Sequence, residues 1–176
     1  MSSAALRSLS TDQLAALGSD QFGALRSEQV AALTTLQLRS LGSEDLNALG
    51  TDQFKGLTTS QIAALSTTQV STLESDDLRT LSSAQVRSLG SDQIGALSTD
   101  NIQALRSEQA GALSTSQIGG LSTDQIKALE SDDLRALGSA QLRALNSDQL
   151  GALSTDNIQA LKSEQVGALS TQQVRG

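Results

Sequence analysis

The chain has 176 residues, of which 12 are basic and 19 acidic, giving a net charge of −7 and a pI near 4.4. This balance argues against a nucleic-acid partner, which needs clustered Lys and Arg, and against an anionic membrane surface. The chain contains no His and no Cys, so it lacks the commonest general base and metal ligand, thiolate metal sites and disulfides.

The chain has no long apolar run, so we expect no membrane insertion. The start MSSAALRSLSTDQ shows no secretory signal, although export through a C-terminal signal stays open and localisation is undetermined.

From residue 2 onward the chain consists of 8-residue units, here called octads, whose positions are numbered one to eight as in Ser10 to Leu17. Position eight is Leu in every octad from Leu9 to Leu169, and position two is always Ser or Thr. Position three is usually acidic, position four is Gln, Asp or Asn after the first octad, position five is apolar and position seven is small. Twenty-one complete octads span residues 2–169 and a partial one spans 170–176, so we treat 1–176 as a single repeat domain of about 22 units.

Each octad contains signals for the start and the end of a helix. The hydroxyl at position two is expected to cap the helix, and the acid beside it lies at the positive end of the helix dipole. A Gly or Asn at position one follows the preceding Leu and is expected to terminate that helix in the left-handed conformation. The residues with this expected role are Gly18, Gly42, Gly50, Gly90, Gly138 and Asn146.

The period of eight excludes a single long helix. Eight residues at 100° each leave the apolar stripe offset by about 80° per octad, so it would circle the helix. In a β-strand, positions five and eight would face opposite sides, and a disordered chain has no reason to keep Leu at every eighth residue. The sequence therefore predicts an all-α solenoid of tandem octads, each one short helix of about six residues with a Ser or Thr N-cap.

A second, longer period relates two blocks of the chain. Residues 74–120 match residues 130–176 at 36 of 47 positions, so segments 74–129 and 130–176 are related by an offset of seven octads. A block duplication is the preferred interpretation, and a superhelical period of seven octads is the alternative. Neither end carries a polar capping unit. This is typical of a fragment of a longer repeat protein, of a designed protein, or of a chain that self-associates through its uncapped ends.

Two polar positions are candidates for chemistry. The acids at position three could form a carboxylate ladder for Ca²⁺, densest at Asp76-Asp77 and Asp132-Asp133. Calcium needs six to eight converging oxygens, so helix N-terminal acids are the preferred interpretation. For Gln at position four, a hydrogen-bonded ladder between coils is preferred over a solvated residue. No residue breaks the pattern as an active site would, so we expect neither an enzyme nor a cofactor.

Basic residues gather at the variable position six, where repeat proteins often present a binding face. The preferred interpretation is a set of solvated charges that balance nearby acids. The alternative is a protein- or peptide-binding face on which Arg79 lies beside Arg87, and Arg135 beside Arg143. The members of this candidate face are Arg39, Lys55, Arg79, Arg87, Lys127, Arg135, Arg143 and Arg175.

The pattern S/T-x-x-Q-Φ-x-A-L, seen as STDQLAAL at Ser10 and STSQIGGL at Ser114, resembles octapeptide arrays of large secreted or surface bacterial proteins of the adhesin or haemagglutinin kind. The resemblance covers essentially the whole chain and implies extension or display at the cell surface. We therefore expect a structural scaffold or spacer, as a segment of a longer bacterial surface or secreted protein. The alternatives are a binding solenoid that uses position six and a designed or consensus repeat protein without a natural function.

Overall fold

The computed structural model describes residues 1–175, and these form 22 short helices with no strand among them. The prediction of an all-α solenoid of single short helices is confirmed. The helices are α1 (Ser3–Arg7), α2 (Thr11–Ala15), α3 (Ser19–Gly23), α4 (Ser27–Ala31), α5 (Thr35–Arg39), α6 (Ser43–Asn47), α7 (Thr51–Gly56), α8 (Thr59–Ala63), α9 (Thr67–Ser71), α10 (Ser75–Thr80), α11 (Ser83–Ser88), α12 (Ser91–Ala96), α13 (Thr99–Gln103), α14 (Ser107–Ala112), α15 (Thr115–Gly119), α16 (Thr123–Ala128), α17 (Ser131–Ala136), α18 (Ser139–Ala144), α19 (Ser147–Gly151), α20 (Thr155–Ala160), α21 (Ser163–Val166) and α22 (Thr171–Arg175).

The N-cap lies one residue earlier than the sequence pattern predicted. Ser10, at position one, has extended backbone, and its hydroxyl accepts a hydrogen bond from the Gln13 amide at 3.1 Å. Thr11, at position two, is already the first helical residue. The Gln13 side chain completes the cap, because its Oε1 accepts from the Ser10 amide at 3.0 Å. This reciprocal pair is a capping box, so position four forms part of the helix start.

The prediction that glycines at position one stop the preceding helix is wrong. Gly18, Gly42, Gly50, Gly90, Gly138 and Asn146 are N-caps with extended backbone, and no residue of 1–175 has a positive φ. Many helices instead end at an extended Leu of position eight, as at Leu57 with φ −65° and ψ 143°. Others end at the position-seven residue in the right-handed helical region, as at Ala16. A glycine cap is tolerated at Gly50 because Gln53 Oε1 still accepts from its amide at 3.1 Å.

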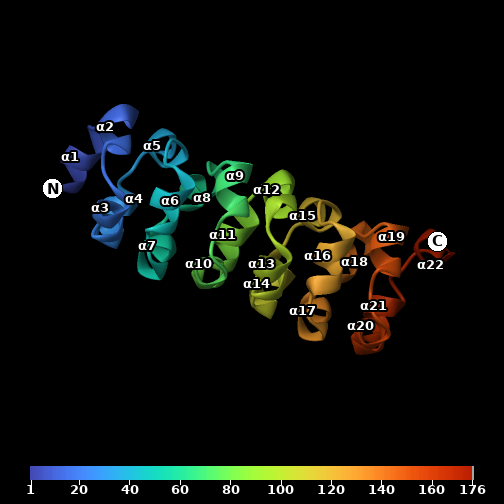
Figure 1. The fold of residues 1–176 in the computed structure, drawn as a ribbon. Coiled ribbons are helices and arrows are strands. Elements are labelled where there is room, and N and C mark those ends of the chain that lie inside the picture. Colours follow the sequence, from blue (N-terminus) through green and yellow to red (C-terminus); the bar gives the residue numbers. More distant parts are fainter. Residues whose placement is uncertain (176) are drawn as a thin grey trace.

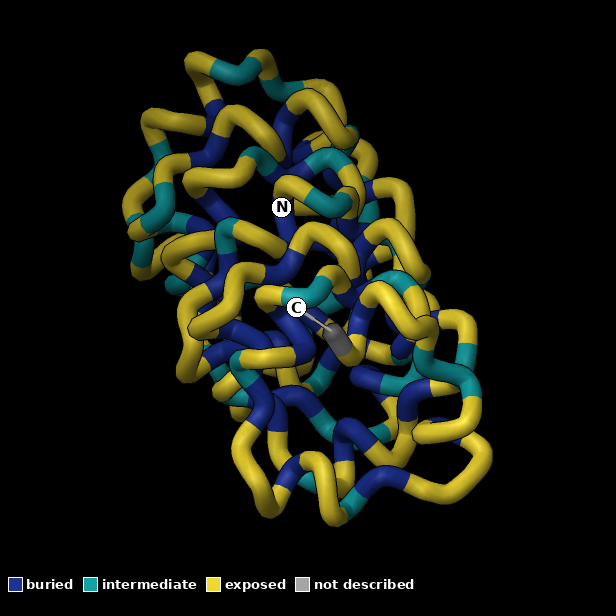
Figure 2. The backbone as a smooth tube through the Cα atoms, turned by 90° about the vertical axis from the view of Figure 1, so that its right-hand side faces the viewer, coloured by how far each residue is buried: buried dark blue, intermediate teal, exposed yellow. Residues whose placement is uncertain are grey.

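Positions five and eight build one continuous apolar core along the whole array. Their side chains are almost entirely buried from Val30 to Leu145, and the two phenylalanines, Phe22 and Phe54, are 0% exposed. Figure 2 shows these buried stretches on the inside of the tube and the exposed bends on its outside. A helix of four to six residues is unstable alone because nucleation is costly. Stacking on neighbouring helices must therefore supply the stability.

The octads wind into a superhelix with about 28 residues, or three and a half octads, per turn. Each helix stacks on the helix three units further along, as α7 does on α10 and α14 on α17. Side-chain bonds between turns join residues 25 to 31 positions apart, such as Gln61 Nε2 to the Leu33 carbonyl, 28 residues earlier. In Figure 1, α7, α10, α14 and α17 follow one another along one side, while α5, α9 and α12 follow the other. The 56-residue offset between the two related blocks equals two such turns.

Candidate binding surface

The described cations of the candidate face all lie exposed on the outside of the superhelix. Each lies in the second half of its short helix, where a cation complements the C-terminal end of the helix dipole. They are Arg39 on α5, Lys55 on α7, Arg79 on α10, Arg87 on α11, Lys127 on α16, Arg135 on α17 and Arg143 on α18. The Arg175 side chain lies outside the described part of the structure.

These cations do not form one continuous face. One octad is eight of the 28 residues in a turn, so successive position-six side chains point roughly 100° apart around the superhelix axis. Helix α10 stacks on α7 and α13, whereas α11 stacks on α8 and α14. Arg79 and Arg87 are therefore not paired along one column, and the same rotation separates Arg135 from Arg143. Position-six cations of successive octads are therefore not neighbours, and only cations on successive turns can lie close together.

One group of cations does meet across turns, in an open groove of about 980 Å³. Its lining includes Lys55 from α7, Arg79 from α10 and Arg106 from the start of α14. Two acids, Asp52 and Asp76, lie in the same groove. The charges thus sum to one net positive charge, on a chain whose total is −7.

Arg106 is the member of this groove that sequence reasoning missed. It occupies position one, where it caps α14 without a side-chain bond. Its guanidinium Nη2 donates to the Leu81 carbonyl at 3.0 Å, and its Nη1 lies 3.7 Å from Glu108. The sequence contained a clue to Arg106. Position one carries Arg or Lys in place of its usual small residue in only a few octads (Arg26, Arg106 and Lys162). Only the three-dimensional stacking, however, brings Arg106 beside Lys55 and Arg79.

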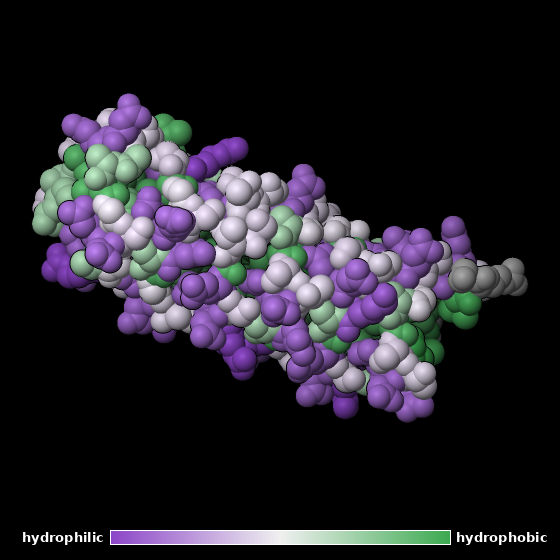
Figure 3. Space-filling model, viewed as in Figure 1, coloured by the Kyte–Doolittle hydropathy of each residue, from purple (hydrophilic) through white to green (hydrophobic). Residues whose placement is uncertain are grey.

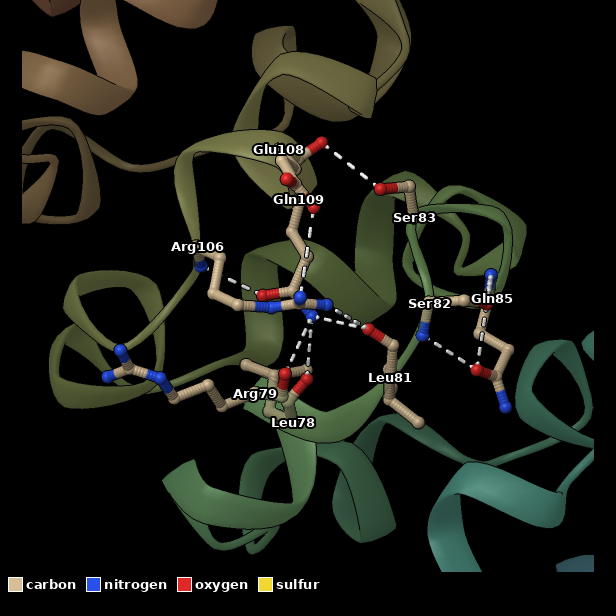
Figure 4. A network of polar contacts seen from close by, with 9 residues as sticks. All are labelled: Leu78, Arg79, Leu81, Ser82, Ser83, Gln85, Arg106, Glu108 and Gln109. Carbon is tan, nitrogen blue, oxygen red and sulfur yellow. Dashed lines mark hydrogen bonds and ion pairs between the residues drawn. The ribbon is translucent and has the colours of Figure 1, made fainter.

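The polar network behind the groove joins one turn of the superhelix to the next (Figure 4). Gln109, 0% exposed, donates from Nε2 to the carbonyls of Leu78 at 2.9 Å and Leu81 at 2.8 Å. Its Oε1 accepts from the Arg106 amide at 2.8 Å. The same arrangement recurs at other position-four glutamines. The predicted glutamine ladder between coils is therefore confirmed from Gln29 onward, where the side-chain amides cap their own helices and satisfy carbonyls of the preceding turn.

Position four is acidic in two buried places, Asp77 and Asp133, which are 4% and 2% exposed. Burial raises the pKa of Asp77 to about 6, and the negative charges of Glu74 and Asp76 act in the same direction. Burial also raises the pKa of Asp133, but hydrogen bonds from the Ser107 hydroxyl and the Glu130 amide oppose that rise.

The carboxylates proposed for calcium diverge in the structure. Asp76 at position three is exposed and Asp77 at position four is buried, and the same division holds for Asp132 and Asp133. Within residues 1–175, no three acidic side chains gather in a way that could hold a metal ion. Each acid at position three instead lies in the first turn of its helix, where the helix dipole favours a negative charge.

Comparison with known families finds the same repeat along the whole chain. The ALTTAQ repeat pattern matches residues 1–27, 24–59, 38–74, 70–107, 102–129, 126–163 and 150–176, which together leave no residue uncovered. No match was found among curated proteins. None of the helices within residues 1–175 is long and apolar enough to cross a membrane.

Proposed function

Because the chain belongs to the ALTTAQ repeat family, we propose that it acts as a structural spacer, forming a segment of a longer bacterial surface or secreted protein. The observation that carries this proposal is the glutamine bridge, which recurs from turn to turn with the same 28-residue spacing (Gln37 to Leu9, Gln61 to Leu33, Gln85 to Leu57). A contact that repeats at a fixed interval sets a fixed rise for each added unit. The length of the rod is then proportional to the number of octads, which is the property that a spacer needs.

The surface setting is supported by the resemblance of the octapeptide array to those of adhesin-like proteins. An antibody raised against the exposed side of the array would test it in bacteria that produce the protein. Labelling of intact cells supports a surface location, and labelling only after permeabilisation contradicts it.

Deleting residues 74–129 tests the spacer proposal itself. This deletion removes seven octads, or two turns, and joins Leu73 to Glu130, whose ESDDLR segment repeats the one at Glu74. Asp133 then stands 28 residues after Leu49, as Asp77 does now, so we expect the stacking between turns to be regenerated. We expect a folded rod whose maximum dimension, measured by small-angle X-ray scattering, falls by about a third because length follows unit number.

A matched control deletes residues 74–101, which is one superhelical turn but not a whole number of octads. It joins position eight of one octad to position five of another, at Leu73 and Ile102, so one helix loses its cap and its start. We expect this variant to lose helicity around the junction in circular dichroism. A 74–129 deletion that collapses or keeps the original maximum dimension would contradict the spacer proposal.

A second candidate function is favoured by the groove between α7, α10 and α14. Among residues 1–175 the ion pairs are Arg26–Glu28, Arg106–Glu108 and Lys127–Asp124, so Lys55 and Arg79 keep their charges available to a ligand. Two unpaired cations on adjacent turns suit an acidic peptide segment.

This second function predicts that a fluorescent deca-glutamate peptide binds the protein in a salt-dependent manner. The double substitution Lys55→Ala with Arg79→Ala should weaken binding at least tenfold in fluorescence anisotropy, because it removes both contacts. The control, Lys127→Ala with Arg143→Ala, removes two position-six cations outside the groove and should leave affinity within twofold. Equal losses in both double variants, or no binding at low salt, would remove this candidate.

A further inference from the structure

The bridge at position four requires a side chain that donates a hydrogen bond to the preceding turn. Glutamine does so from Gln29 to Gln173, as Gln117 does to the Leu89 carbonyl at 2.8 Å. The shorter asparagine also reaches, because Asn101 Nδ2 donates to the Leu73 carbonyl at 3.0 Å and Asn157 Nδ2 to that of Leu129 at 3.3 Å. In both cases the acceptor lies 28 residues earlier.

Asp77 occupies this same position, and its side chain has the length of asparagine. The carbonyl at the corresponding place in the preceding turn belongs to Leu49, in the link between α6 and α7. An ionised carboxylate has no proton to donate, whereas a protonated one carries an O–H donor. The bridge that asparagine makes at Asn101 is therefore open to Asp77 only in its protonated form.

Few hydrogen-bond donors lie where they could stabilise the ionised form of Asp77. In the related octad, the Ser107 hydroxyl donates to Asp133 Oδ1 at 2.9 Å from 26 residues earlier, and the Ser19 hydroxyl does the same for Asp45. The corresponding residue for Asp77 is Thr51, and no hydrogen bond joins their side chains among the described residues. The Asp77 carboxyl thus lacks the hydroxyl donor that both counterparts have.

The charges near Asp77 are mostly negative. Glu74 and Asp76 act on it directly from α10 and its N-cap and raise its pKa. The charged groups of the elements packed around α10 are Asp52 and Lys55 on α7, Asp100 on α13, and Arg106 with Glu108 at the start of α14. Helix α6, which precedes the link that contains Leu49, adds Glu44 and Asp45. Arg79 on α10 itself, Lys55 and Arg106 line the outer groove and are exposed or partly exposed. These three cations therefore contribute less to a buried carboxyl than to the solvent-facing acids beside them.

We propose that Asp77 is a protonation-dependent bridge between two turns of the superhelix. In mild acid it takes a proton from solvent and donates to the Leu49 carbonyl, as Asn101 does to Leu73. At neutral pH it is ionised, the carbonyl has no side-chain donor, and the contact between α10 and the α6–α7 link is weakened. A folded-state pKa above the unfolded value means that this stabilisation is present at low pH and is lost as the pH rises through about 6.

Asp77→Asn tests the proposal because it places a permanent donor of the same shape at this position. Between pH 7.5 and pH 5.0 the wild-type unfolding constant in urea should fall by about tenfold from this group alone, given pKa values of about 6 folded and 3.8 unfolded. The variant should lack that component and should be the more stable protein at pH 7.5. Asp92→Asn, which removes an exposed acid at position three of α12, is the matched charge control and should keep the wild-type pH dependence.

A direct titration needs no variant to fold. The ¹³C signal of the Asp77 carboxyl in the wild-type protein should titrate with a midpoint near 6, and the amide exchange of Leu78 should slow below it. A midpoint near 4 overturns the proposal, and so does an identical pH dependence of unfolding in wild type and Asp77→Asn. Neither result bears on the spacer proposal, which rests on the glutamine bridges.

Discussion

The middle of the array and its two ends are built from the same octads but are covered very differently. Leu81 and Val86 in the middle are 0% exposed, with a turn of the superhelix on either side. Leu9 in the first turn is only partly buried, and Ile158 and Val166 in the last turn are 41% and 49% exposed. In Figure 3 the apolar surface is correspondingly most extensive near the two ends.

Different octad positions become exposed to solvent at the two ends. At the N-terminal end the position-four side chains Gln13 and Gln21 are not buried, while Leu14 at position five stays 0% exposed. At the C-terminal end position five is exposed, while Gln165 at position four is 2% exposed. The octad is therefore directional. Its amide reaches back to the preceding turn, and its position-five side chain is covered by the following one, so each turn is completed by its successor.

The largest expected difference between middle and end comes from truncating the invariant leucine. Leu81→Ala should destabilise the protein by about 3 kcal/mol, because it opens a cavity where no solvent enters. Leu9→Ala should cost about 1 kcal/mol and affect the first turn alone, since that side chain is already partly solvated. Hydrogen–deuterium exchange read helix by helix separates the two. Equal exchange in the first turn of both variants would show that the array unfolds as one unit and that the end is not a separate region.

Removing the amide bridge should have the next largest effect. Gln109→Ala removes the hydrogen bonds to the carbonyls of Leu78 and Leu81. Each carbonyl keeps one other donor, the Leu81 amide and the Arg106 guanidinium respectively, so the cost is that of the lost bonds, about 0.5–1.5 kcal/mol each. Gln13→Ala removes only a local cap bond to Ser10 at an exposed site, so we expect a loss of about 0.5 kcal/mol. Urea midpoints of the two variants give the comparison. Similar losses would mean that the bridge contributes through capping alone, not through contact between turns.

The local part of this fold is readable from the sequence, and the long-range part is not. Leu at position eight and the apolar residue at position five indicate one short helix per octad, and the persistence of Gln at position four indicates a ladder. The sequence predicted the N-cap at position two, one residue too late, because position two always carries a hydroxyl (Thr11 in this octad). Position one, where the cap lies, varies from octad to octad and is Ser10 here. The variable position works as a cap because Gln13 supplies the second bond of the capping box.

The number of octads per turn depends on small angles between successive helices, and no local motif encodes these angles. For this reason Arg79 and Arg87 were expected to be neighbours, and the contribution of Arg106 to the groove was missed. One long-range clue was present in the sequence. The offset of seven octads is about two superhelical turns, so a duplicated block of that length returns each side chain close to its original column.

The smallest expected difference in stability between middle and end comes from substituting glycines at which two backbones approach closely. A Cβ at Gly111 would lie 2.9 Å from the Ala136 carbonyl oxygen, and one at Gly23 would lie 3.0 Å from that of Ala48. In the middle, Gly111→Ala must displace backbone that is held by turns on both sides, and overpacking of this kind costs about 1–3 kcal/mol. At the end, Gly23→Ala can move the first turn outward, so we expect a cost of less than about 1 kcal/mol.

Gly119→Ala is the control for the added methyl group itself. Gly119 shares octad position six with Gly111 and Gly23, but its Cβ would lie 3.7 Å from the Ala144 carbonyl oxygen, an ordinary contact. Alanine favours helix over glycine by up to about 1 kcal/mol, so this variant should be neutral or more stable in urea. If Gly119→Ala were as unstable as Gly111→Ala, position six would require glycine for its backbone conformation. The space left by the neighbouring turn would not be the reason. The spacing between turns would then not be what limits side-chain size along the rod, and the ends would differ from the middle only in their solvent cover.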